Sequence, residues 1–383
     1  MLKKKLYTAL QNFIHLEQFS GLLLMGCLLI SLLIAHSDLS AKYEVFLSDY
    51  SLQHWINEGF MTVFFFVVGL EIKREVMGGE LSEPRQALFP VLAAIGGMVV
   101  PALIYGALNW NGASISGWAI PMATDIAFAL GVLTLLGQQV PLSLKLFLSA
   151  LAIVDDIGAI VVIALFYSGT LSWIHLSYVL VIAAGMAGVA KYYKIRNPFF
   201  FLLALLLIWL CFIPTGIHAT LAGILAAMLV PSATEGPKGE LQSSPLERLE
   251  TMLHPWVAFV ILPAFILANA GVRIDSNFRL IFQEPLFLGI LAGLFLGKPL
   301  GIILFAWLGC RLRWAQKPSN IGWKHIAGVG FIGGIGFTMS LFVSGLSFPA
   351  PHSLLPIAKT AVITASFAAG AVGLGLLNRT CPK

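Results

Sequence analysis

Long apolar runs separated by short polar stretches make up most of the chain. The run at 21–35 reads GLLLMGCLLISLLIA and the run at 199–214 reads FFFLLALLLIWLCFIP, without the alternation that barrel strands require. Because a helix needs about 20 apolar residues to cross the hydrocarbon layer, the pattern predicts membrane-spanning helices. We expect twelve of them, near 18–36, 57–72, 87–108, 118–136, 145–168, 172–190, 199–214, 215–231, 255–271, 284–310, 325–347 and 354–378.

The composition supports an all-α polytopic membrane protein that forms one domain over 1–383. Of the 383 residues, 58% are hydrophobic and 11% are charged, against about 25% charged in soluble domains. This excludes both a soluble and a disordered chain. The four Cys have no metal or redox spacing and no P-loop motif occurs, so we expect a protein that is not an enzyme and has no cofactor.

The distribution of Lys and Arg predicts the topology. With the N-terminus in the cytoplasm, 18 of the 23 basic residues fall in cytoplasmic stretches and three on the opposite side. This split follows the positive-inside rule, places both termini in the cytoplasm, and accounts for the net charge of +5 without nucleic acid. Lys298 and Lys359 remain inside apolar segments, and Lys359 is close enough to a segment end to reach the headgroups.

Two adjacent acids interrupt the fifth segment. Asp155 and Asp156 lie in LAIVDDIGAIVVI, where a charge at the bilayer centre costs about 2.5–3.5 kcal/mol. Two close carboxylates in a low dielectric cannot both ionise easily, so such a pair is suited to holding a proton or a small hard cation. Lys298, in GLFLGKPLGI of the tenth segment, is the natural partner of one of them. A purely structural ion pair is the alternative.

The fourth and eleventh segments have signals that break a helix. Asp125 follows Pro121 and Thr124 in AIPMATDIAFAL, and five Gly fall in the first nine residues of GVGFIGGIGFTMS at 328–340. Broken helices expose ends of opposite partial charge, and Asp125 could neutralise positive N-terminal ends. Because these are the second members of segments 3–5 and 10–12, we expect an inverted repeat with halves near 87–168 and 284–378 and two crossing, broken helices.

Several stretches resemble the NhaA-type sodium/proton antiporters. The similarity runs through nearly the whole chain in the same order. The matching stretches are GLEIKREV at 69–76, ATDIAFALG at 123–131, AIVDDIGAI at 152–160, IHATLAG at 217–223, RLETMLHPW at 248–256, GKPLG at 297–301 and GIGFTMSLF at 334–342.

The resemblance implies exchange of Na⁺ or Li⁺ for H⁺ across the bacterial inner membrane by alternating access. Asp156 would be the principal ion- and proton-binding carboxylate, Asp155 would contribute and pair with Lys298, and Thr124 would lie beside the broken backbone. Asp125 and Lys298 would compensate the helix ends. The transported ions and membrane lipid are then the expected partners, and exchange of more than one H⁺ per Na⁺ would make transport electrogenic.

The resemblance also implies gating by pH through a cytoplasmic cluster, with a role in Na⁺ and pH homeostasis. The matching positions are Glu71, Arg74, Glu75, His218, Glu250 and His254. Thr251 stands where a second His is familiar in the family, which puts the pH set point in question. The family's homodimer uses a β-hairpin after the first segment, and the loop 37–56 is short and lacks the alternation typical of strands.

Two other functions fit the residues less well. A proton-coupled symporter for an organic solute would need a roomier polar site than these few small polar residues suggest. An intramembrane aspartyl protease would need two Asp on separate helices, which Asp125 with Asp155 could supply, but no Gly-x-Gly-Asp precedes either and Lys298 would be unexplained.

Overall fold

The computed structural model describes residues 2–49, 51–79, 81–232, 244–273, 278–318, 320–349 and 352–381. Across these ranges every regular element is a helix and no strand occurs. Eight helices are long and apolar enough to cross a membrane, or up to eleven if each of three bent helix pairs is counted as one span. This confirms the predicted all-helical, polytopic membrane class.

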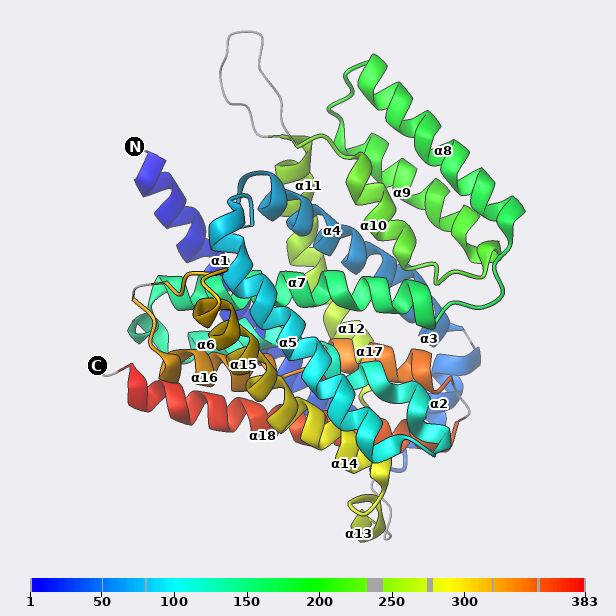
Figure 1. The fold of residues 1–383 in the computed structure, drawn as a ribbon. Helices are drawn as coiled ribbons and strands as arrows, with labels where there is room; N and C mark the ends of the chain where they lie inside the picture. The colour runs from blue at the N-terminus through cyan, green and yellow to red at the C-terminus, as the bar shows by residue number, and fades with distance from the viewer. Residues whose placement is uncertain are drawn as a thin grey trace. The chain divides into compact units, whose positions relative to one another are not determined.

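The helices group into two compact units, each described here by itself. Unit 1 comprises 1–47, 83–159 and 262–383, and unit 2 comprises 48–82 and 160–261. Unit 1 contains α1 (Leu2–Ala35), α5 (Pro84–Asn109), the 3₁₀ helix η2 (Ala113–Met122), α6 (Ile126–Thr134), η3 (Gly137–Gln139), α12 (Leu262–Asn269), α13 (Phe278–Ile281), α14 (Pro285–Ala292), η6 (Gly293–Gly297), α15 (Lys298–Arg311), α16 (Trp323–Gly333), α17 (Phe337–Ser347) and α18 (Leu354–Thr380) (Figure 1).

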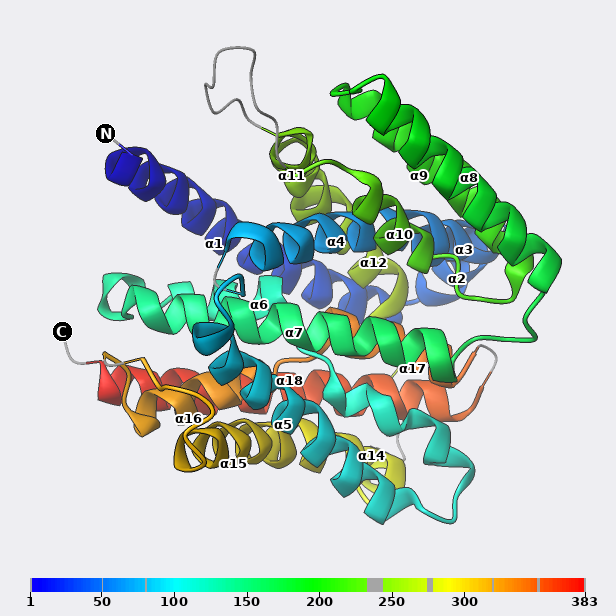
Figure 2. The ribbon, with the colours of Figure 1, turned by 45° about the horizontal axis from the view of Figure 1, so that its top comes forward.

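Unit 2 contains the remaining elements. They are α3 (Leu52–Trp55), η1 (Ile56–Phe60), α4 (Met61–Gly78), α8 (Trp173–Tyr192), α9 (Pro198–Phe212), η4 (Ile213–Thr215), α10 (Leu221–Leu229), α11 (Pro245–Trp256) and η5 (Val257–Ile261). Helices α8 and α9 lie side by side (Figure 2). Helices α2 (Ser40–Asp49) and α7 (Leu142–Phe166) each have residues in both units.

Most predicted segments coincide with helices, with three differences. The predicted segment 215–231 contains only the nine-residue α10, which is too short to span the bilayer alone. The helix predicted to begin at 255 begins at Pro245, because Ser244 and Glu247 form a capping box that starts it ten residues earlier. The loop 37–56 contains helices α2 and α3.

The two predicted helix breaks are both present in unit 1. Helices η2 and α6 are bent by 45° at residues 123–125, and α16 and α17 are bent by 45° at residues 334–336. Each break exposes the C-terminal end of one helix and the N-terminal end of the next, where backbone groups lack helical partners. These two breaks therefore place polar backbone groups in the interior of unit 1, where most of the buried residues are apolar.

Close packing of α5 against α15 fixes the position of the buried lysine. A Cβ atom at Gly96 would collide with the carbonyl of Gly301, and one at Gly301 with the carbonyl of Gly96. The two backbones approach closely only because neither residue has a side chain. The two helices pack against each other within unit 1 (Figures 1 and 2), and Lys298 at the start of α15 lies against Gly97 of α5.

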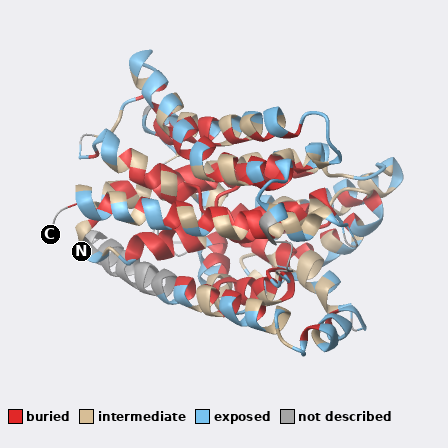
Figure 3. Cartoon of the chain, turned by 90° about the horizontal axis from the view of Figure 1, so that it is seen from below, coloured by how far each residue is buried: buried red, intermediate tan, exposed pale blue. Residues whose placement is uncertain are grey.

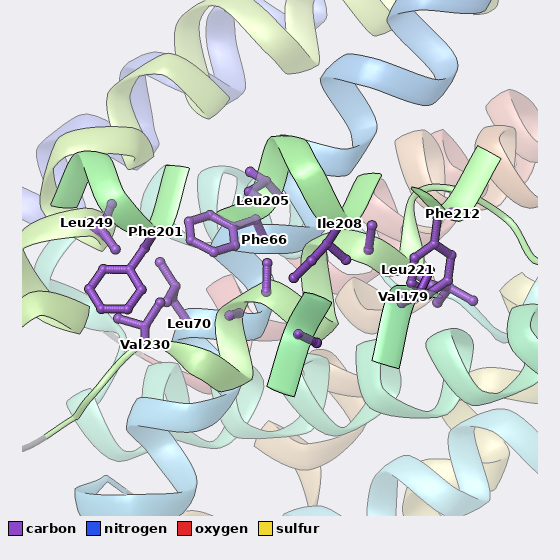
Figure 4. Packing of buried hydrophobic residues seen from close by; sticks show 14 of the residues in the cluster. Phe66, Leu70, Val179, Phe201, Leu205, Ile208, Phe212, Leu221, Val230 and Leu249 are labelled. Carbon is purple, nitrogen blue, oxygen red and sulfur yellow. The ribbon is translucent and has the colours of Figure 1, made fainter. Parts of the chain in front are cut away.

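Unit 2 has its own apolar core. Phe66 and Leu70 of α4 pack with Phe201, Leu205 and other buried residues of α8, α9, α10 and α11 (Figure 4). The outer side of α8 is also apolar: Leu180 is 57% and Val181 is 69% exposed, and exposed positions recur along the helices (Figure 3). Such apolar exposure is stable against lipid rather than water.

Candidate functional site

One carboxylate caps both broken helices of unit 1. Asp125 precedes α6 in extended conformation, and its Oδ1 accepts a hydrogen bond from the backbone N–H of Phe128 at 3.0 Å. Its Oδ2 accepts from the backbone N–H and the hydroxyl of Thr338 in the first turn of α17, at 2.9 and 2.5 Å. A buried negative group thus lies at two helix N-termini, where the partial charge is positive.

A backbone hydrogen bond joins the two breaks directly. The N–H of Asp125 donates to the carbonyl oxygen of Ile335 at 2.8 Å. Both residues are non-helical and buried, so this bond satisfies two backbone groups that the breaks would otherwise leave unpaired. The breaks are therefore linked to each other through their main chains as well as through Asp125.

Lys298 contacts the opposite, negative end of a broken helix. Its side chain is completely buried, and its Nζ donates to the carbonyl oxygen of Met122, the last residue of η2. The same ammonium lies 2.9 Å from Oδ2 of Asp155. Lys298 follows directly on the π-helical turn η6, an irregularity that is often found at functional sites. It thus neutralises both a carboxylate and a helix C-terminus.

Thr124 links the acid pair to the second break. Its hydroxyl lies 2.5 Å from Oδ2 of Asp155 and 3.0 Å from the carbonyl oxygen of Gly333, the last residue of α16. A hydroxyl carries one proton and can donate to only one of these acceptors at a time. The arrangement joins α7, the first break and the second break around one polar point.

The two adjacent acids of α7 are both buried. Asp155 is 1% and Asp156 is 3% exposed, although adjacent helical residues point about 100° apart. Oδ1 of Asp155 is buried and has no hydrogen-bond partner within the part of the chain that the structure describes. A buried carboxylate oxygen without a partner is costly unless a proton or cation occupies it. Among the side chains that the structure describes in unit 1, Asp125, Asp155 and Asp156 are the buried acids and Lys298 is the buried base.

A second group of charged residues lies in unit 2. Nη1 of Arg74 lies 2.5 Å from Oε1 of Glu250, and its Nη2 lies 3.0 Å from Oε1 of Glu75. Glu250 is 7% exposed, whereas the Arg74 side chain is 43% exposed. Glu71 is one helical turn before Glu75 and interacts electrostatically with Glu250. These residues couple α4 to α11.

The two predicted His residues lie in different places. His254 is one turn after Glu250 on α11 and is half-buried. His218 does not join this group: its Nδ1 is 3.7 Å from Oε1 of Glu58. Glu58 and Glu75 lie near opposite ends of one continuous helix, about 25 Å apart along its axis. The structure therefore separates His218 from the other five predicted pH-sensing residues.

The sequence analysis missed Thr338. It donates two hydrogen bonds to Asp125 and is buried among the helix ends, but its stretch was considered only for its glycines and for the family resemblance. Its position offered a signal, because a Thr directly after a glycine-rich break falls in the first turn of the following helix. The link between Glu58 and His218 was missed as well, since the two residues are 160 positions apart.

Comparison with known proteins gives a consistent result. The family model described as Na⁺/H⁺ antiporter 1 matches residues 11–377. The chain is 47% identical over 381 residues to the Na⁺/H⁺ antiporter NhaA of Pseudomonas putida, covering 94% of this chain and 95% of that protein. It is 45% identical over 379 residues to the NhaA of Vibrio cholerae, covering 97% and 98%. It is 43% identical to NhaA 1 of Clostridium beijerinckii, covering 98% and 96%.

Proposed function

The chain belongs to the Na⁺/H⁺ antiporter 1 family and exchanges Na⁺ for H⁺, and we propose that this exchange takes place at Asp155 and Asp156. The two adjacent buried acids of α7 beside the one ammonium of Lys298 carry this proposal. When the acids ionise, the uncompensated negative charge attracts either protons or a small cation. Na⁺ and H⁺ therefore compete for the same oxygen atoms, and binding of one displaces the other.

The residues around the pair have different roles in this proposal. Asp156 is the principal carboxylate for Na⁺ (or Li⁺) and H⁺, and Asp155 contributes its unpaired Oδ1. Thr124 offers a hydroxyl oxygen beside Asp155. Asp125 compensates the positive N-terminal ends of α6 and α17, and Lys298 compensates the negative C-terminal end of η2. Alternating access then exposes the site to each side of the membrane in turn.

The membrane topology belongs to the same proposal. Twelve helical segments cross the bacterial inner membrane in contact with lipid, the short α10 doing so together with the turn that precedes it, and both termini lie in the cytoplasm, as the positive-inside count favours. The inverted repeat has halves near 87–168 and 284–378, and the two breaks at matching positions support it. We leave the family's β-hairpin dimer out of the proposal, because the described residues of the loop 37–56 include two helices and no strand.

Regulation by pH is proposed for the acid–arginine group of unit 2. Arg74 holds Glu75 and Glu250 together, and protonation of either acid would weaken a contact between α4 and α11. Glu71 and His254 add titratable groups beside it. His218 acts from a separate place on Glu58. Through this regulation the antiporter contributes to Na⁺ and pH homeostasis.

Everted vesicles from cells that lack other antiporters test the function. A pH-sensitive dye reports proton release from respiring vesicles when Na⁺, Li⁺ or K⁺ is added. We expect a response to Na⁺ and Li⁺ that depends on pH, and none to K⁺. Proteoliposomes with valinomycin then test charge movement: an imposed membrane potential should accelerate exchange if more than one H⁺ moves per Na⁺. Equal responses to all three cations would contradict a selective acid site.

A further inference from the structure

A cavity of about 420 Å³ lies within unit 2. It is lined by residues of α3 and η1, the loop after α7, the end of α9 and the turn before α10. Its volume is in the range of small-molecule sites, about 300–1,000 Å³, and is far larger than a bare Na⁺ requires. Of the described residues that line it, His218 and its neighbour Glu58 belong to the proposed pH regulation, and the others belong neither to it nor to the ion site.

Two neighbouring tryptophans, Trp55 and Trp209, form part of the lining of this cavity. The rings of Trp55 and Trp209 have centroids 5.9 Å apart and planes inclined at 41°, so they are tilted rather than stacked. Tyr167 adds a third ring to the lining. The indole Nε1 of Trp209 is buried and has no hydrogen-bond partner among the residues that the structure describes. Aromatic faces within about 6 Å of a cation attract it electrostatically.

Glu58 is the single acid among the described residues that line the cavity. Its Oε1 is 3.7 Å from Nδ1 of His218, which is longer than a hydrogen bond, and the two side chains are 22% and 17% exposed. The carboxylate therefore lies partly shielded from water beside aromatic rings. In that setting it attracts a cation more strongly than a carboxylate on the surface would.

The loop and turn that line the cavity, at Gly169 and Gly216, are held in place by backbone contacts. Gly216 has a φ of +82°, and its carbonyl oxygen accepts a hydrogen bond from the N–H of Gly169 at 2.7 Å. The N–H of Ser172 donates to the carbonyl oxygen of Thr215 at 2.8 Å. A side chain at residue 216 would collide with the carbonyl of Thr170. These contacts keep the cavity open without a ligand, which lowers the entropy lost on binding.

We propose that this cavity binds a small planar organic cation of the aryl amidinium or aryl guanidinium class. The charged plane would pair with the Glu58 carboxylate, and the aryl ring would lie against Trp55 and Trp209. Planar, delocalised cations match both a carboxylate and an aromatic face. A metal ion of similar charge would instead require several oxygen ligands, which aromatic rings do not supply. The proposal is independent of how Asp155 and Asp156 exchange ions.

Binding of benzamidinium to the purified full-length protein tests this site. Isothermal titration at about pH 8.5 keeps the amidine charged and most carboxylates ionised. Benzamide, neutral and of nearly the same shape, is the matched probe for charge, and benzylammonium is the matched probe for planarity. We expect benzamidinium to bind about tenfold more tightly than either. Equal affinity for benzamide would overturn the role of charge, and equal affinity for benzylammonium would overturn the preference for a planar cation.

Substitutions of residues that line the cavity, compared with substitutions elsewhere, test whether benzamidinium binds in it. Glu58→Gln should weaken benzamidinium binding about tenfold, whereas Glu284→Gln, at an exposed Glu of unit 1, should leave it unchanged. Trp209→Leu should weaken it severalfold, in contrast to Trp307→Leu on α15. Size-exclusion profiles and Na⁺-dependent exchange show whether each variant is folded. A folded Glu58→Gln variant with wild-type affinity would overturn the proposal.

Discussion

The ammonium of Lys298 lies 2.9 Å from Oδ2 of Asp155, and both side chains are fully buried. Breaking a buried ion pair on one side leaves an isolated charge that water cannot solvate. Lys298 also donates a hydrogen bond to the carbonyl oxygen of Met122 at the C-terminus of η2. Its removal therefore leaves both the Asp155 carboxylate and this helix C-terminus uncompensated. The pair therefore contributes both to stability and to the electrostatics of the proposed ion site.

We expect Lys298→Met to destabilise the purified protein by about 3–5 kcal/mol, seen as a lower Tm in thermal unfolding. Lys359→Met on α18 is the matched control and should change Tm much less. The double variant Asp155→Asn with Lys298→Met should recover part of the loss, because neither charge is then left alone. A double variant that is less stable than the sum of the single changes would contradict the pairing.

Asp125 is expected to act through two helix caps at once. Asp125→Ala should destabilise by about 2 kcal/mol, roughly twice the effect of a single cap. Asn197→Ala, which removes one cap from α9, is the matched control and should cost about 1 kcal/mol. Asp125→Asn should destabilise the protein less than Asp125→Ala, because Asn keeps one acceptor oxygen but loses the charge. Equal losses for Asp125→Ala and Asn197→Ala would contradict the double cap.

Much of the fold followed from the sequence because hydrophobic length is a strong signal in membranes. The breaks near Asp125 and in 328–340 were predicted from Pro, Thr and Gly, and both are present. The early start of α11 was not predicted, because its first turns are amphipathic and hydrophobic length detects only continuous apolar runs. The nine-residue α10 was not predicted either, since the apolar run continues through the non-helical turn at Gly216.

The candidate site was only partly predictable for a related reason. A charge inside an apolar run is conspicuous, so Asp125, Asp155, Asp156 and Lys298 were found without a structure. Ordinary residues give a much weaker signal: Thr338 is marked only by its place after the glycine-rich break, and the carbonyl of Met122 is identified as a partner of Lys298 only by its contact. The separation of His218 from Arg74 likewise depends on which end of the continuous helix Leu52–Gly78 each one contacts, and this cannot be read from the spacing of residues in the sequence.

Thr124 offers a test of the ion site that spares the carboxylates. Thr124→Val keeps the shape but removes the hydroxyl beside Asp155, and we expect it to raise the apparent KM for Na⁺ about tenfold. Thr124→Ser keeps the hydroxyl and should stay within about twofold of the wild type. The measurement is Na⁺-dependent dye response in everted vesicles. Similar KM values for Val and Ser variants would exclude a role for the hydroxyl.

Glu250 offers a test of pH regulation. Glu250→Gln removes one negative charge from the group around Arg74, so the remaining acids release their protons more easily. We therefore expect half-maximal exchange to occur at a more acidic pH, with little change in the maximal rate. Glu284→Gln, which removes one negative charge from an exposed position in unit 1, is the control. Identical pH profiles for the two variants would rule out this group as the sensor.

The most direct measurement is Na⁺-dependent proton movement by the Asp156→Asn variant in everted vesicles. Asn has nearly the same size and cannot bind or release a proton, so the exchange proposed here cannot occur through it. We predict that the variant inserts at wild-type levels and gives no dye response to Na⁺ at any pH between about 6.5 and 8.5. Exchange at the wild-type rate would contradict the assignment of Asp156 as the carboxylate that Na⁺ and H⁺ share.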